Sequence, residues 1–186
     1  MGRIASESSR MATLVEDLLT LARLDEGRPL EITDIDLVKL ADNAVFDLQA
    51  LDPTRTVGLT GITGRTPPMS LIVPGDRDRL SQVFTNLIGN IVRYTPAGSP
   101  VEIALGLSGD TAIVELRDHG PGIDENDRGR VFERFYRADT SRNRKSGGSG
   151  LGLAIVSGIL AAHRGRASLT KTKGGGLTVR IELPTA

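Results

Sequence analysis

Residues 147–153 read Gly-Gly-Ser-Gly-Leu-Gly-Leu and run directly into the apolar segment Ala154-Ile155-Val156. Glycine allows positive φ angles and close approach of a ligand to the backbone, and the start of a helix offers unpaired N–H groups to an anion. The stretch therefore indicates a phosphate site at the beginning of a helix or strand. A flexible connector is the competing interpretation, and this run alone does not decide between them.

Two common nucleotide motifs are excluded by the same residues. Gly147 and Gly152 have the end spacing of a P-loop, but Leu153 stands where that motif needs lysine. The dinucleotide motif G-x-G-x-x-G is also absent, because Leu153 follows Gly148-x-Gly150-x-x. A nucleotide site here would be of a third kind.

Composition limits the possible functions. The 186 residues fit one domain with an appendage, and 39% of them are hydrophobic. The net charge of zero gives no support to nucleic-acid binding, so we expect no nucleic-acid partner. The chain has no cysteine, and no apolar run approaches the roughly 18 residues that span a bilayer. The start at Met1 has neither signal-peptide nor transit-peptide character, so we expect no membrane contact from these residues.

The first 25 residues contain a long predicted helix over 3–25. One apolar stripe has spacings of 7, 4, 3 and 4, typical of a helix bundle, and comprises Ile4, Met11, Val15, Leu18 and Ala22. Leu14 and Leu21 add a second stripe, and residues 27–29 end the helix. The pattern favours the tail of a larger bundle over a helix packed on its own domain.

The remaining chain predicts an α+β fold. Asp36 is the expected N-cap of a helix that carries its apolar face from Leu37 to Leu48, and Pro74-Gly75-Asp76 opens a second helix that runs to about Tyr94. A third helix is expected over 151–163. The predicted strands are 30–35, 56–62, 69–73, 101–107, 111–117, 166–171 and 177–182, with a hairpin turn at 108–110. Residues 119–150 form a polar connection long enough to be functional.

Two asparagines stand out in the helix ending at Tyr94. Asn86 and Asn90 are one turn apart, and Arg93 follows on the same face or its edge. Amide side chains on an apolar helix face need partners, and an amide oxygen is a hard ligand suited to Mg²⁺. Capping or solvent-facing asparagines are the alternative, although the helix continues past both.

Two further segments carry polar or aromatic signals. Asp118-His119-Gly120-Pro121-Gly122-Ile123 follows a strand, and its carboxylate could accept a hydrogen bond from an exocyclic amine; alone it is an ordinary turn. Residues 132–137, together with Tyr94, hold four of the six aromatic residues, which indicates a docking surface or a hinge anchor. The long loop also carries five cations suited to a polyphosphate: Arg134, Arg137, Arg142, Arg144 and Lys145.

The motifs occur in one order along the chain. They are Asn86-x-x-x-Asn90-x-x-Arg93-Tyr94, Asp118-x-Gly120-x-Gly122, Phe132-x-Arg134-Phe135-Tyr136-Arg137 and Gly148-x-Gly150-Leu151-Gly152-Leu153. This set resembles the N, G1, F and G2 boxes of sensor histidine kinases. The resemblance covers residues 75–186, extends back to about residue 30, and is specific only as a joint match. The helix over 3–25 resembles the second helix of the family's dimerisation and phosphoacceptor domain.

The resemblance implies a two-layer Bergerat fold, with a mixed sheet covered on one face by about three helices and a long ATP lid over residues 137–146. Residues 1–27 would be the end of a dimerisation helix, and 28–186 the ATP-binding catalytic domain. The implied ligands are ATP and Mg²⁺. The implied partners are a phosphoacceptor histidine on the missing domain, a cognate response regulator and a second copy in the full-length protein. The implied location is the cytoplasmic part of a membrane-anchored sensor.

The resemblance also implies residue roles. Asn90 would ligate Mg²⁺, Asn86 would support the phosphates, and Arg93 and Arg137 would neutralise phosphate charge. Asp118 would accept a hydrogen bond from the 6-amino group of adenine. The other implied nucleotide-binding residues are Tyr94, Gly120, Gly122, Ile123, Lys145, Gly148, Ser149, Gly150, Leu151 and Gly152. The glycines of 147–152 would act as a hinge for the lid.

Three positions depart from the family pattern. Ile91 stands where a small residue is usual and would tighten the packing beneath the nucleotide. Leu177 replaces a threonine after Gly176, so Thr178 becomes the substitute for an adenine contact. His119 occupies a variable position, and we expect it to form local hydrogen bonds.

Two other function classes remain as alternatives. Molecular clamps of the gyrase, Hsp90 or MutL kind place a glutamate general base where this chain has Asn86, and an amide cannot take a proton from water. The second alternative is a regulatory nucleotide-sensing module, such as an anti-sigma kinase or a degenerate kinase. The aromatic segment and the first helix argue against an anti-sigma kinase. The intact Asn90, Asp118 and Gly150 argue against a degenerate kinase.

Histidine occurs only at positions 119 and 163. Neither lies in the family's phosphoacceptor context, and His163 is expected as a cation at a helix C-terminus. We therefore predict that this chain binds ATP without phosphorylating itself, as a fragment lacking the phosphoacceptor helix. Incubation with γ-labelled ATP is expected to leave no acid-labile phosphate on the chain. Stoichiometric labelling would contradict this prediction.

Overall fold

The computed structural model describes residues 2–137 and 148–185, with the helical backbone alone for residues 2–7, 9 and 10. In chain order the elements are α1 (Gly2–Asp25), β1 (Thr33–Asp36), α2 (Leu37–Leu51), β2 (Val57–Gly61), β3 (Ile72–Gly75), α3 (Arg77–Tyr94), β4 (Val101–Ser108), β5 (Thr111–Asp118), α4 (Gly152–Ala162), β6 (Arg166–Lys171) and β7 (Leu177–Pro184). Every helix and strand expected from the sequence is present, with shifted ends in several cases.

A mixed five-stranded sheet forms one layer, in the order β2-β4-β5-β7-β6. β2 runs parallel to β4, and the other neighbours are antiparallel. The predicted β4–β5 hairpin is confirmed, with Ser108 paired to Thr111 across the turn. β1 and β3 form a separate antiparallel pair.

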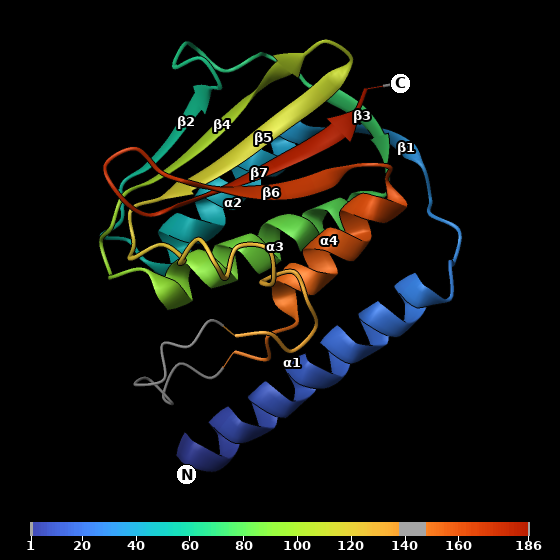
Figure 1. Cartoon of the computed structure of the whole chain (residues 1–186), viewed down its shortest axis with the longest axis vertical. Helices are drawn as coiled ribbons and strands as arrows, with labels where there is room; N and C mark the ends of the chain where they lie inside the picture. Colours follow the sequence, from blue (N-terminus) through green and yellow to red (C-terminus); the bar gives the residue numbers. More distant parts are fainter. Residues whose placement is uncertain (1, 138–147, 186) are drawn as a thin grey trace.

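Helices α2, α3 and α4 cover one face of this sheet, and α1 lies beyond them (Figure 1). The core between the layers is apolar, and its fully buried residues include Leu48, Leu87, Ile103, Leu116 and Ile155. Burial of such side chains is the main stabilising contribution, at roughly 1.5–3 kcal/mol each. The expected two-layer α+β architecture is confirmed.

Two aspartates start the helices that frame the sheet. The Asp36 carboxylate accepts a hydrogen bond from the Val38 N–H, which confirms the predicted cap of α2. The Asp76 carboxylate accepts from the N–H groups of Asp78 and Arg79 at the start of α3. Pro74 and Gly75, expected to open α3, belong to β3 instead, because they pair with Asp34 and Thr33.

The two short strands of this pair begin later than expected. The strand predicted over 30–35 starts at Thr33, and the strand predicted over 69–73 starts at Ile72. Met69 is fully exposed, so apolar character at that position did not indicate burial. Strand ends follow from pairing between distant residues, which local sequence does not specify.

His163 is buried and joins two helices. Its Nδ1 lies 2.8 Å from the Ile159 carbonyl oxygen, and its Nε2 accepts a hydrogen bond of 2.9 Å from the Asp76 N–H. A ring nitrogen that accepts carries no proton, so Nδ1 is the donor and the ring is neutral. The expectation of a cation at the helix end is therefore wrong; His163 instead ties the end of α4 to the cap of α3.

Helix α1 packs on the domain through residues of its second half. Leu21 is buried, and Leu24 lies against Gly158 of α4. The predicted bundle stripe stays open, since Met11, Val15 and Leu18 are exposed, while Ile4 lies outside the described side chains. In the described part of the chain, no helix combines the length and apolarity needed to cross a membrane.

Arg55 holds the turn that follows α3. Its guanidinium is buried and donates hydrogen bonds to Thr95 Oγ1 (2.9 Å), to the Ser99 carbonyl (2.8 Å) and to the Pro96 carbonyl (3.2 Å). Asp52 Oδ2 lies 3.3 Å from the same guanidinium. The hydrogen bond from the Thr54 side chain, together with the Gly98 N–H and Arg55, lowers the pKa of Asp52. This cluster fixes residues 95–99 against the sheet.

We predict that Arg55→Ala lowers the free energy of unfolding by about 2–4 kcal/mol, because it removes several hydrogen bonds from a buried charge and leaves their partners unpaired. Denaturant unfolding measures the change. Arg65→Ala is the matched control, since Arg65 is exposed, and we expect it to lie within about 0.5 kcal/mol of the wild type. Equal effects of the two substitutions would contradict a structural role for Arg55.

Candidate nucleotide site

The asparagines of α3 face the beginning of α4. A Cβ atom built on Gly152 would lie 3.7 Å from Asn86 Oδ1 and 3.9 Å from Asn90 Oδ1. Asn86 Nδ2 is buried and has no hydrogen-bond partner among residues 2–137 and 148–185. A buried donor without an acceptor is costly, so this amide is suited to an acceptor from a ligand.

The glycine run meets the C-terminal end of α3 at Gly148. A Cβ atom there would lie 2.9 Å from Arg93 Nη1 and 2.8 Å from the Tyr94 hydroxyl. Any side chain would displace these groups, so glycine allows the backbone to lie directly against them. The sequence motif at 148 and the motif at 93–94 are therefore one site in space.

Gly150 joins the glycine run to the aromatic segment through a backbone hydrogen bond and close packing. It has φ of +73°, and its carbonyl accepts a hydrogen bond from the Phe135 N–H at 3.0 Å. A Cβ atom on Gly150 would lie 3.0 Å from backbone atoms of Phe135 and Tyr136. Phe135 is itself a residue with positive φ (62°) and an exposed ring. The described part of the predicted hinge is thus a closely packed turn.

Ser149 shapes the first turn of α4. Its hydroxyl accepts a hydrogen bond from the Leu151 N–H at 3.2 Å. The Leu151 side chain is fully buried in the core, so only its backbone could meet a ligand. The first N–H groups of a helix lack intrahelical acceptors. In α4 these N–H groups follow Leu151, and they begin at Gly152, which lies near the Asn86 and Asn90 amides. This arrangement suits an anion.

Asp118 forms the other end of the site. Its buried carboxylate accepts hydrogen bonds at Oδ1 from the Gly120 N–H (2.9 Å) and the Leu177 N–H (3.2 Å). In the described residues no donor reaches Oδ2, which leaves that oxygen for an exocyclic amine. Two backbone donors hold the carboxylate in one orientation, so the direction of Oδ2 is fixed as well.

Glycines bring three segments together around Asp118. A Cβ atom on Gly176 would lie 2.0 Å from the Asp118 carbonyl oxygen, so no other residue fits at this position. Gly120 packs on Thr95, the residue after α3, and Gly122 packs on the Gly176 carbonyl. Ile123 is half-buried beside them in sequence.

The departures from the family pattern have clear places in the structure. Ile91 is buried on α3, in the core. Thr178 is buried and its hydroxyl pairs with Thr172 at 2.9 Å, so the contact expected from Thr178 is not supported. The strand meets Asp118 through the Leu177 N–H instead. His119 Nε2 lies 3.6 Å from Glu102 Oε1, too far for a hydrogen bond.

Most predicted site residues are thus brought together, in two groups joined by α3. The first group comprises Asn86, Asn90, Arg93, Tyr94, Gly148, Ser149, Gly150, Leu151 and Gly152, and the second comprises Asp118, Gly120, Gly122 and Ile123. Arg137 is exposed. Arg142, Arg144, Lys145 and Gly147 lie outside the described residues, as does most of the expected lid.

Residues outside the motifs also contact the site. Arg55 holds Thr95 against Gly120, and Asp17 of α1 accepts a hydrogen bond of 3.0 Å from Ser149 Oγ. An Arg three residues after an Asp in a polar loop carries no sequence signal of burial. Likewise, Asp17 lies 132 positions from Ser149, so no local pattern joins them.

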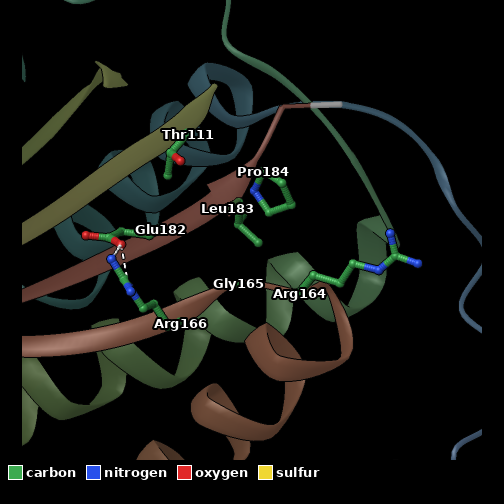
Figure 2. Close-up of a pocket in the computed structure, with 7 residues that line it drawn as sticks. All are labelled: Thr111, Arg164, Gly165, Arg166, Glu182, Leu183 and Pro184. Atoms are coloured by element: carbon green, nitrogen blue, oxygen red, sulfur yellow. Dashed lines mark hydrogen bonds and ion pairs between the residues drawn. The ribbon is translucent and has the colours of Figure 1, made fainter. Parts of the chain in front are cut away.

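A surface hollow lies at the opposite end of β5 from Asp118 (Figure 2). It is lined by Thr111, Arg164, Gly165, Arg166, Glu182, Leu183 and Pro184. Figure 2 shows Arg166 paired with Glu182 while Arg164 points away. Thr111 and Asp118 are seven residues apart on β5, which places the hollow about 23 Å from Asp118 at the usual rise per strand residue. The hollow is therefore separate from the nucleotide site.

Comparison with known proteins identifies the family of this chain. Residues 75–186 match the family described as "Histidine kinase-, DNA gyrase B-, and HSP90-like ATPase". The protein named "Probable sensor histidine kinase TcrY" of Mycobacterium tuberculosis is 44% identical over 174 residues, which are 94% of this chain and 36% of TcrY. The signal transduction histidine-protein kinase BaeS of Escherichia coli is 38% identical over 182 residues, which are 97% of this chain and 38% of BaeS.

A solved structure gives the same result. The ATP binding domain of PrrB from Mycobacterium tuberculosis superposes with a TM-score of 0.67 at 28% identity, covering 84% of this chain and 98% of that one. The chain spans little more than a third of the curated relatives TcrY and BaeS. It belongs to the family of histidine kinase-, DNA gyrase B- and HSP90-like ATPases, and within that family it corresponds to the ATP-binding catalytic domain of sensor histidine kinases.

Proposed function

We propose that residues 28–186 bind Mg²⁺-ATP and supply its γ-phosphate to a histidine on a dimerisation domain, for relay to an aspartate of a response regulator. One observation carries the proposal: the amides of Asn86 and Asn90 converge on the glycine-lined start of α4, and Asn86 Nδ2 has no partner in the described part of the chain. A phosphate oxygen is the acceptor that this donor needs.

The triphosphate would lie between α3 and the start of α4. Arg93 would neutralise its charge, and the first N–H groups of α4 would donate to phosphate oxygens. Phosphoryl transfer depends mostly on positioning and charge neutralisation, which such a set can supply. Arg137 and Lys145 belong to this proposal on the family resemblance alone.

The donor set fits a magnesium ion carried by the nucleotide. The Asn90 amide oxygen is a hard ligand, and Mg²⁺ usually keeps waters and binds through substrate phosphates. In the described residues, no group of three or more His, Cys, Asp or Glu side chains could hold a metal ion. Asn90 would therefore contribute one oxygen, and the triphosphate and water would complete the shell.

The base would lie against the second group of site residues. Asp118 Oδ2 would accept a hydrogen bond from the 6-amino group of adenine, which guanine lacks at that position. Tyr94 and Ile123 would contact the ring, and Gly120 and Gly122 would form the floor. The fixed orientation of the carboxylate, held by two N–H groups, supports this selectivity.

The side chain at position 86 favours transfer over hydrolysis. A hydrolytic clamp needs a general base to activate water, and an asparagine amide cannot take a proton. The γ-phosphate would therefore go to a histidine nucleophile rather than to water. This argument separates the proposal from the gyrase-like and Hsp90-like functions of the same family.

The proposal for the wider assembly rests on the family resemblance. Residues 1–27 would be the C-terminal part of the second helix of the dimerisation and phosphoacceptor domain, and the full-length protein would be a homodimer. The cognate response regulator would be its phosphotransfer partner, and this domain would lie on the cytoplasmic side of a membrane-anchored sensor.

We predict that Asn90→Ala weakens ATP binding in Mg²⁺ by roughly 10- to 100-fold, in line with about 1.5–3 kcal/mol for a contact with a charged group, and changes binding in EDTA much less. Calorimetric titration with ATP, in Mg²⁺ and in EDTA, measures both. Asn43→Ala is the control, since Asn43 is exposed on α2. An equal loss in EDTA would show that Asn90 does not act through the metal.

We predict that Asp118→Asn weakens ATP binding and removes most of the preference for ATP over GTP, because the Gly120 and Leu177 N–H groups hold the amide oxygen and the NH₂ group then faces the 6-amino group of adenine. Competition of both nucleotides against a fluorescent ATP analogue measures the preference. Asp110→Asn, at the exposed turn before β5, is the control. Unchanged ATP affinity in Asp118→Asn would contradict the assignment of the base pocket.

A further inference from the structure

Two carboxylates of helix α1 contact loop residues of the domain, and one of these residues, Ser149, belongs to the candidate site. Asp17 Oδ2 accepts a hydrogen bond of 3.0 Å from Ser149 Oγ, and Asp25 accepts two from Arg134, at 2.9 and 2.6 Å. Eight residues separate the two aspartates, about 12 Å along a helix. One contact is with the glycine run and the other with the aromatic segment, so α1 spans both sides of the Gly150–Phe135 turn.

The Asp17 contact is at the phosphate end of the proposed site. Ser149, which donates to Asp17, also accepts from the Leu151 N–H at the start of α4. The neighbouring Gly148 lies directly against Arg93. Arg93 is near enough to act on Asp17 electrostatically. The Asp17 carboxylate therefore lies close to the place where the proposed site would bind the phosphates of the nucleotide.

The surroundings of Asp17 leave its charge incompletely compensated. Burial is the main reason that the pKa of Asp17 is raised; the charge of Glu16 adds to the effect, while Ser149 and Arg93 oppose it. A further anion at Ser149 and Arg93 would face this carboxylate at short range, and like charges at short range disfavour each other.

Helix α1 buries few of its described side chains against the domain. Among the described side chains of α1 only Thr20 and Leu21 are buried, and Thr20 Oγ1 accepts a hydrogen bond of 3.3 Å from Gln82 Nε2. Five large apolar side chains of the helix are exposed: Met11, Leu14, Val15, Leu18 and Leu19. Exposed ion pairs contribute little, typically about 0–1 kcal/mol. A contact of this size can be displaced by a charged ligand.

We propose that docked α1 and ATP compete, because Asp17 places a negative charge at the phosphate end of the site, so that nucleotide binding releases α1 and α1 docking weakens nucleotide binding. This inference rests on the proposed function. Because competition is reciprocal, docking weakens ATP binding by the same factor as ATP weakens docking, so a change that loosens α1 strengthens ATP binding.

The first test is the affinity of Mg²⁺-ATP and Mg²⁺-ADP for the whole chain, measured by calorimetry. Asp17→Asn is expected to strengthen ATP binding about 3- to 10-fold, the range of a modest coupling between sites, and ADP binding less, since ADP lacks the terminal phosphate. Glu16→Gln is the matched control, because it removes the same charge from the adjacent exposed position, and it is expected to change the affinity less than twofold.

The second test separates docking from local charge. Asp25→Asn breaks the pair with Arg134 away from the Ser149 contact, and it is also expected to strengthen ATP binding. Glu26→Gln is its control, since Glu26 is exposed and pairs only with Arg28 in the described residues. Strengthening in Asp17→Asn without strengthening in Asp25→Asn would overturn the competition, because it would reflect local charge alone.

The third test observes α1 directly. The chain has no cysteine, so spin labels at Ala12→Cys and Ala161→Cys, both at exposed positions, report the α1–α4 distance. Mg²⁺-ATP is expected to broaden and lengthen the distance distribution. An unchanged distribution with saturating ATP, or equal ATP affinities in all variants, would overturn this inference alone. Absence of nucleotide binding in every variant would overturn the proposed function and the inference together.

Discussion

The close approach of the glycine run to α3 is the constraint on which the rest of the site depends. At Gly148 an added Cβ atom would displace the ends of the Arg93 and Tyr94 side chains, and at Gly152 it would lie in van der Waals contact with the Asn86 and Asn90 amides. The sheet and the core hold α3 and α4 side by side (Figure 1). Because these glycines carry no side chains, space remains between the two helices. Amides, a guanidinium and the first N–H groups of α4 line this space.

The site is also supported from outside the motifs. Arg55 fixes the turn after α3, on which Gly120 packs, and His163 joins the end of α4 to the cap of α3. Helix α1 is different, because it adds charge instead of rigidity. Its contacts are few and partly exposed, and they lie on the two segments that meet at Gly150. Because α1 is weakly bound beside the nucleotide site of a rigid domain, a change in nucleotide binding can alter the docking of α1, and a change in docking can alter nucleotide binding.

Local patterns predicted those features that depend on neighbours in sequence. The Asp36 cap, the 108–110 hairpin and the amphipathic face of α3 needed only a few adjacent residues, and all are confirmed. The starts of β1 and β3 were misplaced because each strand is defined by pairing with the other. The charge of His163 was wrong because its neutral form depends on the Asp76 N–H, 87 positions away.

The sequence by itself determined the fold class, the order of the motifs and the residue types of the nucleotide site. Periodicity, caps and spacing are local quantities, and the joint order of four motifs is specific even where each one is weak. Only the tertiary structure decided that Gly148 meets Arg93, that Gly176 closes on Asp118, and that Asp17 reaches Ser149. Such contacts arise from the packing of layers, which sets distances between residues that no sequence interval encodes.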